Sequence, residues 1–129
     1  MDNRCMNEKF QEIAEDLIIE REELKELRES DVTVILLDSD SAKKNKREKV
    51  LGQCEKVADK WKWAVPCDFT ITLFKPNIIG LTEEQIRILI FHELLHIGID
   101  GDKMFIRDHD LKDFKVIIDE FGVNWNATE

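Results

Sequence analysis

The segment TEEQIRILIFHELLHIG, residues 82–98, decides the fold and the chemistry that we expect. Thr82 and Gln85 have the spacing of a capping box, which predicts a helix that begins here. Apolar residues then continue to the end of the segment, where Gly98 is typical of the residue that ends a helix. The second half of this helix is apolar on nearly all sides, so we expect it to be buried.

Three polar side chains interrupt the apolar helix: His92, Glu93 and His96, in the pattern His-Glu-x-x-His. Residues four apart lie on one side of a helix, so both imidazoles can reach one metal ion. A zinc ion lowers the pKa of its bound water to about 7, and a nearby carboxylate can take the proton during attack on a carbonyl. We therefore predict one catalytic zinc ion per chain, with Glu93 as the base of a hydrolase. The alternative is that core hydrogen bonds satisfy all three side chains, but their burial on adjacent turns favours a bound ion.

A catalytic zinc site also needs a third protein ligand and one open position. His109 is the remaining histidine, and we predict that it is this ligand because imidazole suits zinc. It lies near the start of the predicted last helix, where the helix dipole disfavours imidazolium, and Asp113 could accept its second N–H. Asp100 is the main competing ligand, and Asp108 and Asp110 are weaker ones. His109 could instead be a surface residue that caps the helix.

Composition limits the other classes of function. With 129 residues and 43% apolar content, the chain is expected to form a single domain, residues 1–129. A net charge of −9 argues against a nucleic-acid partner. The beginning of the sequence has no signal-peptide pattern, and no apolar run approaches the roughly 18 residues of a membrane span. The odd number of widely spaced cysteines suits reduced thiols, so we expect a cytoplasmic protein that does not enter membranes.

The other segments predict an α+β fold in which a small, mostly antiparallel sheet packs with helices. Apolar residues spaced by three and four predict an amphipathic N-terminal helix within residues 1–30, at about 6–29, that lies on the sheet. A last helix is predicted from about 108–110 to 121, ending at Gly122. Residues 41–49 are polar and predict a loop or a short helix. Short strands are predicted at residues 31–38, 51–58, 69–74 and 105–107.

Two smaller features of the sequence are interpreted as structural rather than functional. The basic run at residues 43–49 is interpreted as a solvated loop rather than a binding site for an acidic partner. Trp61 and Trp63 are expected to pack against the N-terminal helix rather than line a substrate cleft.

The residues resemble the family of phage metallopeptidase domains, which belongs to the zincin class with the pattern HExxH…H. The resemblance covers about residues 31–122 and leaves the N-terminal helix outside. The motifs that carry it are LGxCxKV at 51–57, DFxIT at 68–72, LTxEQ at 81–85, HELLHIG at 92–98 and HDLxDF at 109–114.

The resemblance implies a minimal zincin-like fold, with zinc bound by His92, His96 and His109 and with Glu93 catalytic. It also implies a phage or prophage origin and action in the cytosol of a bacterial host. In the zincin class the strand before the metal helix pairs with an extended substrate, so residues 69–74 are expected to be that edge.

We therefore predict a zinc-dependent metallopeptidase that hydrolyses peptide or protein substrates with a Glu-activated, zinc-bound water. One alternative is a zinc hydrolase of RNA or a small amide. The order His92, His96, Gly98 and Asp100 is loosely similar to a bacterial rRNA-processing metalloenzyme, although such an enzyme does not need Glu93. The other alternative is a non-catalytic regulatory or binding module, and the intact Glu93 weighs against it.

Overall fold

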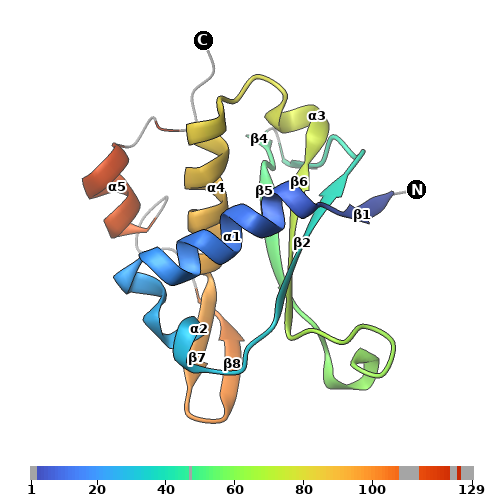
Figure 1. Ribbon diagram of the computed structural model, residues 1–129. Helices are drawn as coiled ribbons and strands as arrows, with labels where there is room; N and C mark the ends of the chain where they lie inside the picture. The colour runs from blue at the N-terminus through green and yellow to red at the C-terminus, as the bar shows by residue number, and fades with distance from the viewer. Residues whose placement is uncertain (1–2, 47, 108–113, 123–124, 126–129) are drawn as a thin grey trace.

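The computed structural model describes residues 3–46, 48–107, 114–122 and 125 of the chain, and it is a mixed α+β fold with small sheets, as predicted (Figure 1). The described helices are α1 (Glu8–Glu20), α2 (Lys25–Glu29), α3 (Lys75–Ile78), α4 (Glu83–Leu95) and α5 (Lys115–Phe121), with 3-10 turns at Glu22–Leu24 and Asp59–Trp61. The described strands are β1 (Arg4–Met6), β2 (Val34–Ser39), β3 (Lys44–Asn45), β4 (Glu48–Lys49), β5 (Gly52–Lys56), β6 (Phe69–Phe74), β7 (Ile97–Asp100) and β8 (Lys103–Ile106).

The main sheet has four strands in the order β1-β2-β6-β5. β1 and β5 run antiparallel to their neighbours, whereas β2 and β6 are parallel, so the sheet is mostly antiparallel as predicted. β6 pairs with β2 on one side and with β5 on the other. The prediction that residues 69–74 form a free docking edge is therefore wrong. Alternation identified this strand correctly, but its position in the sheet depends on pairing with distant segments.

One apolar core lies between the main sheet and the helices α1 and α4. Figure 1 shows α1 crossing in front of both the sheet and α4. The core includes Leu36 of β2 and three alternate residues of β6, all of them fully buried: Phe69, Ile71 and Leu73. Full burial of such a side chain contributes about 1.5–3 kcal/mol. The core thus fixes α4, which carries the predicted site, against the sheet.

The N-terminal segment is not the continuous helix that the sequence predicted. Residues 4–6 form strand β1, and Asn7 then caps α1 by accepting a hydrogen bond from the backbone N–H of Phe10. Arg21 has an extended backbone that ends α1. Its guanidinium forms ion pairs with Glu23 and Glu120 and lies 4.5 Å from the ring centroid of Phe91. The contacts with Glu120 and Phe91 are long-range, and helical periodicity reveals neither these contacts nor the break at Arg21.

Helix α4 begins with the predicted capping box. The backbone N–H of Gln85 donates to the Thr82 hydroxyl (3.2 Å), and the backbone N–H of Thr82 donates to the side-chain oxygen of Gln85 (2.8 Å). The second half of the helix is buried, as expected from its apolar sequence. α4 ends at Leu95, however, and the next residues form β7 rather than a further turn of helix.

Gly98 does not end the helix in a left-handed conformation, so that prediction is wrong. The positive-φ glycines among the described residues are Gly101 and Gly122. Gly98 lies in β7 opposite Phe105 of β8, and a Cβ atom at Gly98 would be 2.7 Å from Phe105 Cδ2 and closer to two other ring carbons. Gly98 is therefore needed for the close approach of this ring. The two-residue turn between β7 and β8 uses Gly101, with φ of 61°.

Within the polar segment at residues 41–49, Lys44–Asn45 and Glu48–Lys49 pair as the antiparallel strands β3 and β4, where the sequence predicted a loop or a short helix. The buried side-chain amide of Asn77 donates to the carbonyl oxygens of Lys43 and Val50, both at 2.8 Å. These two bonds hold both ends of the hairpin on the body of the protein.

The tryptophans at residues 61 and 63 do not pack against the N-terminal helix, because 52% and 82% of their surfaces are exposed. They lie on the connection between β5 and β6, which Asp68 holds in place. The Asp68 carboxylate accepts from the Thr33 backbone N–H (2.9 Å) and the Lys62 ammonium (3.0 Å). Burial alone would raise the pKa of Asp68, but these two donors outweigh it and hold the pKa below its usual value.

The last helix is shorter than predicted. Phe114 has an extended backbone and precedes α5, so a continuous helix from residues 108–110 to 121 is excluded. Its end at Gly122 is as predicted. Within the described part of the chain, no helix has the length and apolar character needed to cross a membrane.

Candidate metal centre

His92, Glu93 and His96 lie together near the C-terminal end of α4. One ligand atom from each of the three lies within 4.8 Å of the others. His92 and His96 are one helical turn apart, and their ring centroids are separated by 5.1 Å. Glu93 is 4% exposed and both histidines are partly buried, so the cluster faces the interior of the protein. The geometry brings two imidazoles and a carboxylate close enough together to hold one metal ion.

The position of His96 is fixed by strand β8 and the residue after it. Its Nδ1 lies 2.7 Å from the carbonyl oxygen of Arg107. A carbonyl oxygen only accepts, so Nδ1 carries the proton, and in the neutral imidazole Nε2 is then the nitrogen that has the lone pair. The backbone N–H of Arg107 donates in turn to the His96 carbonyl oxygen. The hairpin β7–β8 therefore selects the tautomer in which Nε2 can bind a metal ion.

Glu93 lies between His92 and strand β5. Its Oε2 is 3.7 Å from Nε2 of His92. On its other side is Gly52, where a Cβ atom would be 3.3 Å from both Cγ and Oε2 of Glu93 and 2.9 Å from Cδ2 of Leu73. Glycine at this position thus allows the strand to approach the carboxylate. Burial, and then the negative charge of Glu93, raise the pKa of the neighbouring Cys54 thiol.

Two aromatic residues from the C-terminal part of the chain pack against the histidines. The ring of Phe114 lies 5.6 Å from His92 and 5.0 Å from His96 between centroids, and the ring of Trp125 lies 6.0 Å from His92. Both aromatic residues are buried. The sequence placed Phe114 in the predicted last helix but did not connect it with the histidines, and no role was predicted for Trp125. An isolated tryptophan among polar residues near the end of the sequence is the signal that could have revealed it.

The residues of the cluster fit a zinc ion. Imidazole nitrogens are preferred zinc ligands, and a carbonyl bond to the second ring nitrogen is the usual support of such a ligand. Asp100, the main alternative ligand, is exposed at the end of β7 and is not part of the cluster. His109, together with Asp108, Asp110 and Asp113, lies outside the described residues, so its assignment as the third ligand stays a prediction.

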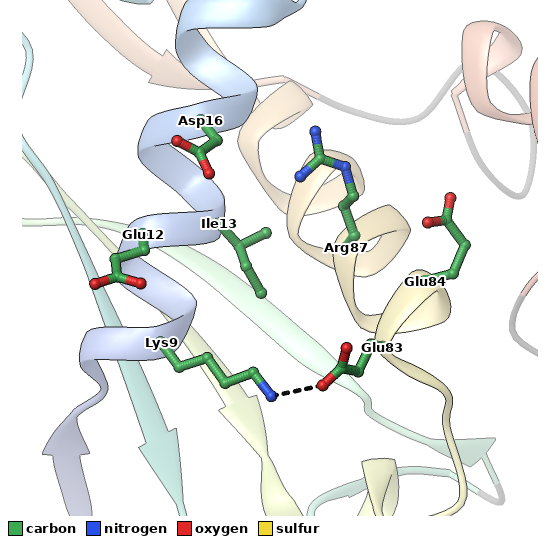
Figure 2. Close-up of a pocket in the computed structure, with 7 residues that line it drawn as sticks. All are labelled: Lys9, Glu12, Ile13, Asp16, Glu83, Glu84 and Arg87. Carbon is green, nitrogen blue, oxygen red and sulfur yellow. Dashed lines mark hydrogen bonds and ion pairs between the residues drawn. The ribbon is translucent and has the colours of Figure 1, made fainter.

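A hollow lies on the surface between α1 and α4 and contains none of the predicted site residues (Figure 2). It measures about 350 Å³, and charges of both signs line it around Ile13. Lys9 and Glu83 form an ion pair across it, with 3.0 Å between nitrogen and oxygen. Arg87 reaches Glu20 at 2.6 Å. This hollow is therefore a surface feature with charges of both signs between α1 and α4, and it is separate from the histidine cluster.

Comparison with known families agrees with the class that the cluster indicates. A family described as "Putative phage metallopeptidase" matches residues 4–129, and the chain therefore belongs to this family. The match includes the N-terminal helix, which the sequence analysis had placed outside the resemblance. No curated protein and no solved structure gives a significant match.

Proposed function

We propose that the protein is a zinc-dependent metallopeptidase in which His92, His96 and His109 hold the metal and Glu93 is the general base. The bond between His96 and the Arg107 carbonyl is the observation that carries the metal site, because it places the proton on Nδ1 and makes Nε2 the nitrogen of neutral His96 that can bind a metal ion. Membership in a metallopeptidase family supports peptide bonds as the substrate. A minimal zincin-like architecture and a cytosolic location in a bacterial host belong to the same proposal.

Glu93 has the position that a general base requires. Its Oε2 lies 3.7 Å from Nε2 of His92, and the residue is almost completely shielded from bulk water. A zinc ion in such a site polarises a carbonyl group and makes water acidic enough to be deprotonated near neutral pH. Glu93 can hold the proton released from the attacking water and return it to the amine that leaves. The apolar surroundings strengthen the electrostatic effect of each charge in this step.

The outer edge of β5 is the docking edge that we propose for an extended peptide, in place of β6. In the antiparallel pair of β5 and β6, the main-chain groups of β5 face β6 at every second residue. The hydrogen bonds from Phe74 N to Leu51 O and from Val57 N to Asp68 O show that Leu51 and Val57 face β6. The main-chain groups of Gly52 and every second residue after it therefore point away from β6. Because Gly52 also adjoins Glu93, a main chain paired at this edge would lie next to the proposed base.

The substitution Glu93→Gln tests the proposed function. Glutamine nearly preserves the shape of the side chain but cannot take a proton, so zinc should remain bound while peptide hydrolysis falls by roughly 10²–10⁴-fold. The matched control is Glu84→Gln, the same change at an exposed position of the first turn of α4. The control should keep both properties. Hydrolysis would be measured on a fluorogenic peptide library, with metal analysis of each purified variant.

Full activity of Glu93→Gln would exclude Glu93 as the base. Loss of zinc from the same variant would make Glu93 a ligand, and the reaction would then need another proton acceptor. Cleavage of RNA or of a small amide, with no cleavage of any peptide, would replace the proposed substrate class.

A further inference from the structure

Trp125 contacts helix α4, which carries His92, although 40 positions separate Trp125 from Gln85 in the first turn of α4. Its carbonyl oxygen accepts a hydrogen bond of 2.9 Å from the side-chain nitrogen of Gln85. Its ring lies at a tilt of 44° to the ring of His92, with centroids 6.0 Å apart. Only 8% of the residue is exposed. Trp125 thus contacts α4 at both ends, through its main chain at the first turn and through its ring at His92.

Gln85 uses both ends of its side-chain amide. The oxygen accepts the Thr82 backbone N–H and completes the capping box, while the nitrogen donates to Trp125. Glutamate, the other residue used at this position of a capping box, could accept from Thr82 but has no proton for the Trp125 carbonyl when ionised. The capping function therefore leaves the choice of glutamine unexplained, and the bond to Trp125 explains it.

We propose that Gln85 and Trp125 are positioning residues of the metal site, so that zinc binding and docking of Trp125 are coupled. The inference rests on the proposed zinc site. An imidazole that is free to rotate loses this freedom when a metal binds, whereas a ring already held between Trp125 and Phe114 has lost it beforehand. Docking of Trp125 should therefore strengthen zinc binding at His92. By linkage, bound zinc should strengthen the docking of Trp125 by the same factor.

The test uses the full chain with Trp61→Phe and Trp63→Phe. The sequence has three tryptophans, and these two are exposed, so Trp125 becomes the single tryptophan reporter. We expect emission at short wavelength, as for a buried indole, and strong quenching when Co²⁺ replaces Zn²⁺ beside His92. In Gln85→Glu the emission should move to longer wavelength. The zinc Kd, measured by competition with a chromophoric chelator, should rise about 10–100-fold, as for loss of a residue that supports a metal ligand.

Thr82→Ala is the matched control, because it removes the other half of the same capping box. It should lower the Tm but leave the zinc Kd and the Trp125 emission unchanged. Trp125→Ala in the unaltered chain should raise the zinc Kd to a similar extent as Gln85→Glu. The variant with both changes should bind zinc no more weakly than the weaker-binding single variant, because both changes act through the docking of residue 125 on α4.

An unchanged zinc Kd in Gln85→Glu and in Trp125→Ala would overturn the inference. So would an equal rise of the Kd in Thr82→Ala, since the effect would then come from the start of the helix in general. If the unaltered chain binds neither Zn²⁺ nor Co²⁺, the proposed metal site fails, and the coupling fails with it. Zinc binding that is insensitive to Gln85 and Trp125 would leave the proposed function standing and remove the coupling alone.

Discussion

The substitution Gly98→Ala places one methyl group at the point where the hairpin β7–β8 supports the metal site. The new Cβ atom would lie 2.7 Å from Cδ2 of Phe105 and closer to two other ring carbons, whereas ordinary carbon contacts begin near 3.5 Å. The ring must therefore move by about an ångström or rotate away. The same β8 strand leads directly to the Arg107 carbonyl that holds His96. The change should consequently affect both stability and zinc binding.

Two routes of relaxation give similar costs. If the Phe105 ring stays in place, the overpacked contact costs about 1–3 kcal/mol of unfolding free energy. If the ring turns into solvent, its buried part becomes exposed. Because 43% of the residue is exposed already, only the remainder of its burial is lost. That loss is roughly half of the 1.5–3 kcal/mol of full burial, which is about 0.8–1.5 kcal/mol. The expected fall in Tm is roughly 3–12 °C for a chain of this length.

The assay combines thermal unfolding with a zinc competition titration. Gly101→Ala is the matched control in the same hairpin, because Gly101 has φ of 61° and nothing lies within 4 Å of its added Cβ. It should cost about 1–2 kcal/mol through backbone strain alone and leave the zinc Kd unchanged. Gly98→Ala should raise the zinc Kd as well. Adding Phe105→Ala should remove most of the penalty of Gly98→Ala, a non-additivity expected for residues in contact.

The reasoning would be refuted by a Gly98→Ala variant with an unchanged Tm and zinc Kd. Strict additivity with Phe105→Ala would refute it as well, because the two residues would then not interact.

His109→Ala should weaken zinc binding far more than Asp100→Ala, since loss of a ligand outweighs loss of an exposed carboxylate outside the cluster. Competition with a chelator ranks the zinc Kd of the two variants, and the reverse order would make Asp100 the ligand. Asp68→Asn should reduce the free energy of unfolding at pH 7, because the pKa of Asp68 is lower in the folded protein than in the unfolded chain. The stability that Asp68 adds is fully present above the unfolded pKa, about pH 4, and is lost as the pH falls through the folded pKa. Urea unfolding against pH should thus show a shallower acid decline in the variant, and an unchanged profile would contradict the assignment. Lys56→Pro removes an outward N–H of β5 and should raise KM with little change in kcat, whereas Glu55→Pro removes a bond to β6 and should destabilise the fold. Equal effects of the two prolines would argue against docking at this edge.

The sequence predicted those features that depend on local pattern. The capping box of Thr82 and Gln85 located the start of α4 correctly, and the apolar second half of that helix indicated its burial. Alternation placed β6 at the observed residues. The spacing of His92 and His96 predicted that their rings lie close together, because the geometry of a helix fixes which side chains share a face. These inferences need no knowledge of the rest of the chain.

The remaining features depend on contacts between distant residues. The order of the strands, and therefore which of the described strands lie at the edges of the sheet, follows from pairing across the whole sheet. Arg21, where α1 ends, forms an ion pair with Glu120, a contact that no local pattern contains. Gly98 illustrates the same limit, because a glycine after an apolar helix is typical of a helix end, whereas here the ring of Phe105 requires it. The support of His96 comes from a backbone carbonyl, a group that every residue has and that sequence cannot distinguish.

The most direct test of the account is a crystal structure of the zinc-loaded protein with anomalous data collected on both sides of the zinc absorption edge. The account predicts one zinc ion per chain, bound by Nε2 of His92 and Nε2 of His96, with His109 as third ligand and one position left open. Glu93 should lie beside that open position without binding the ion. A zinc ion at another place would contradict the proposed centre, and a site closed by four protein ligands would contradict catalysis and indicate a structural role.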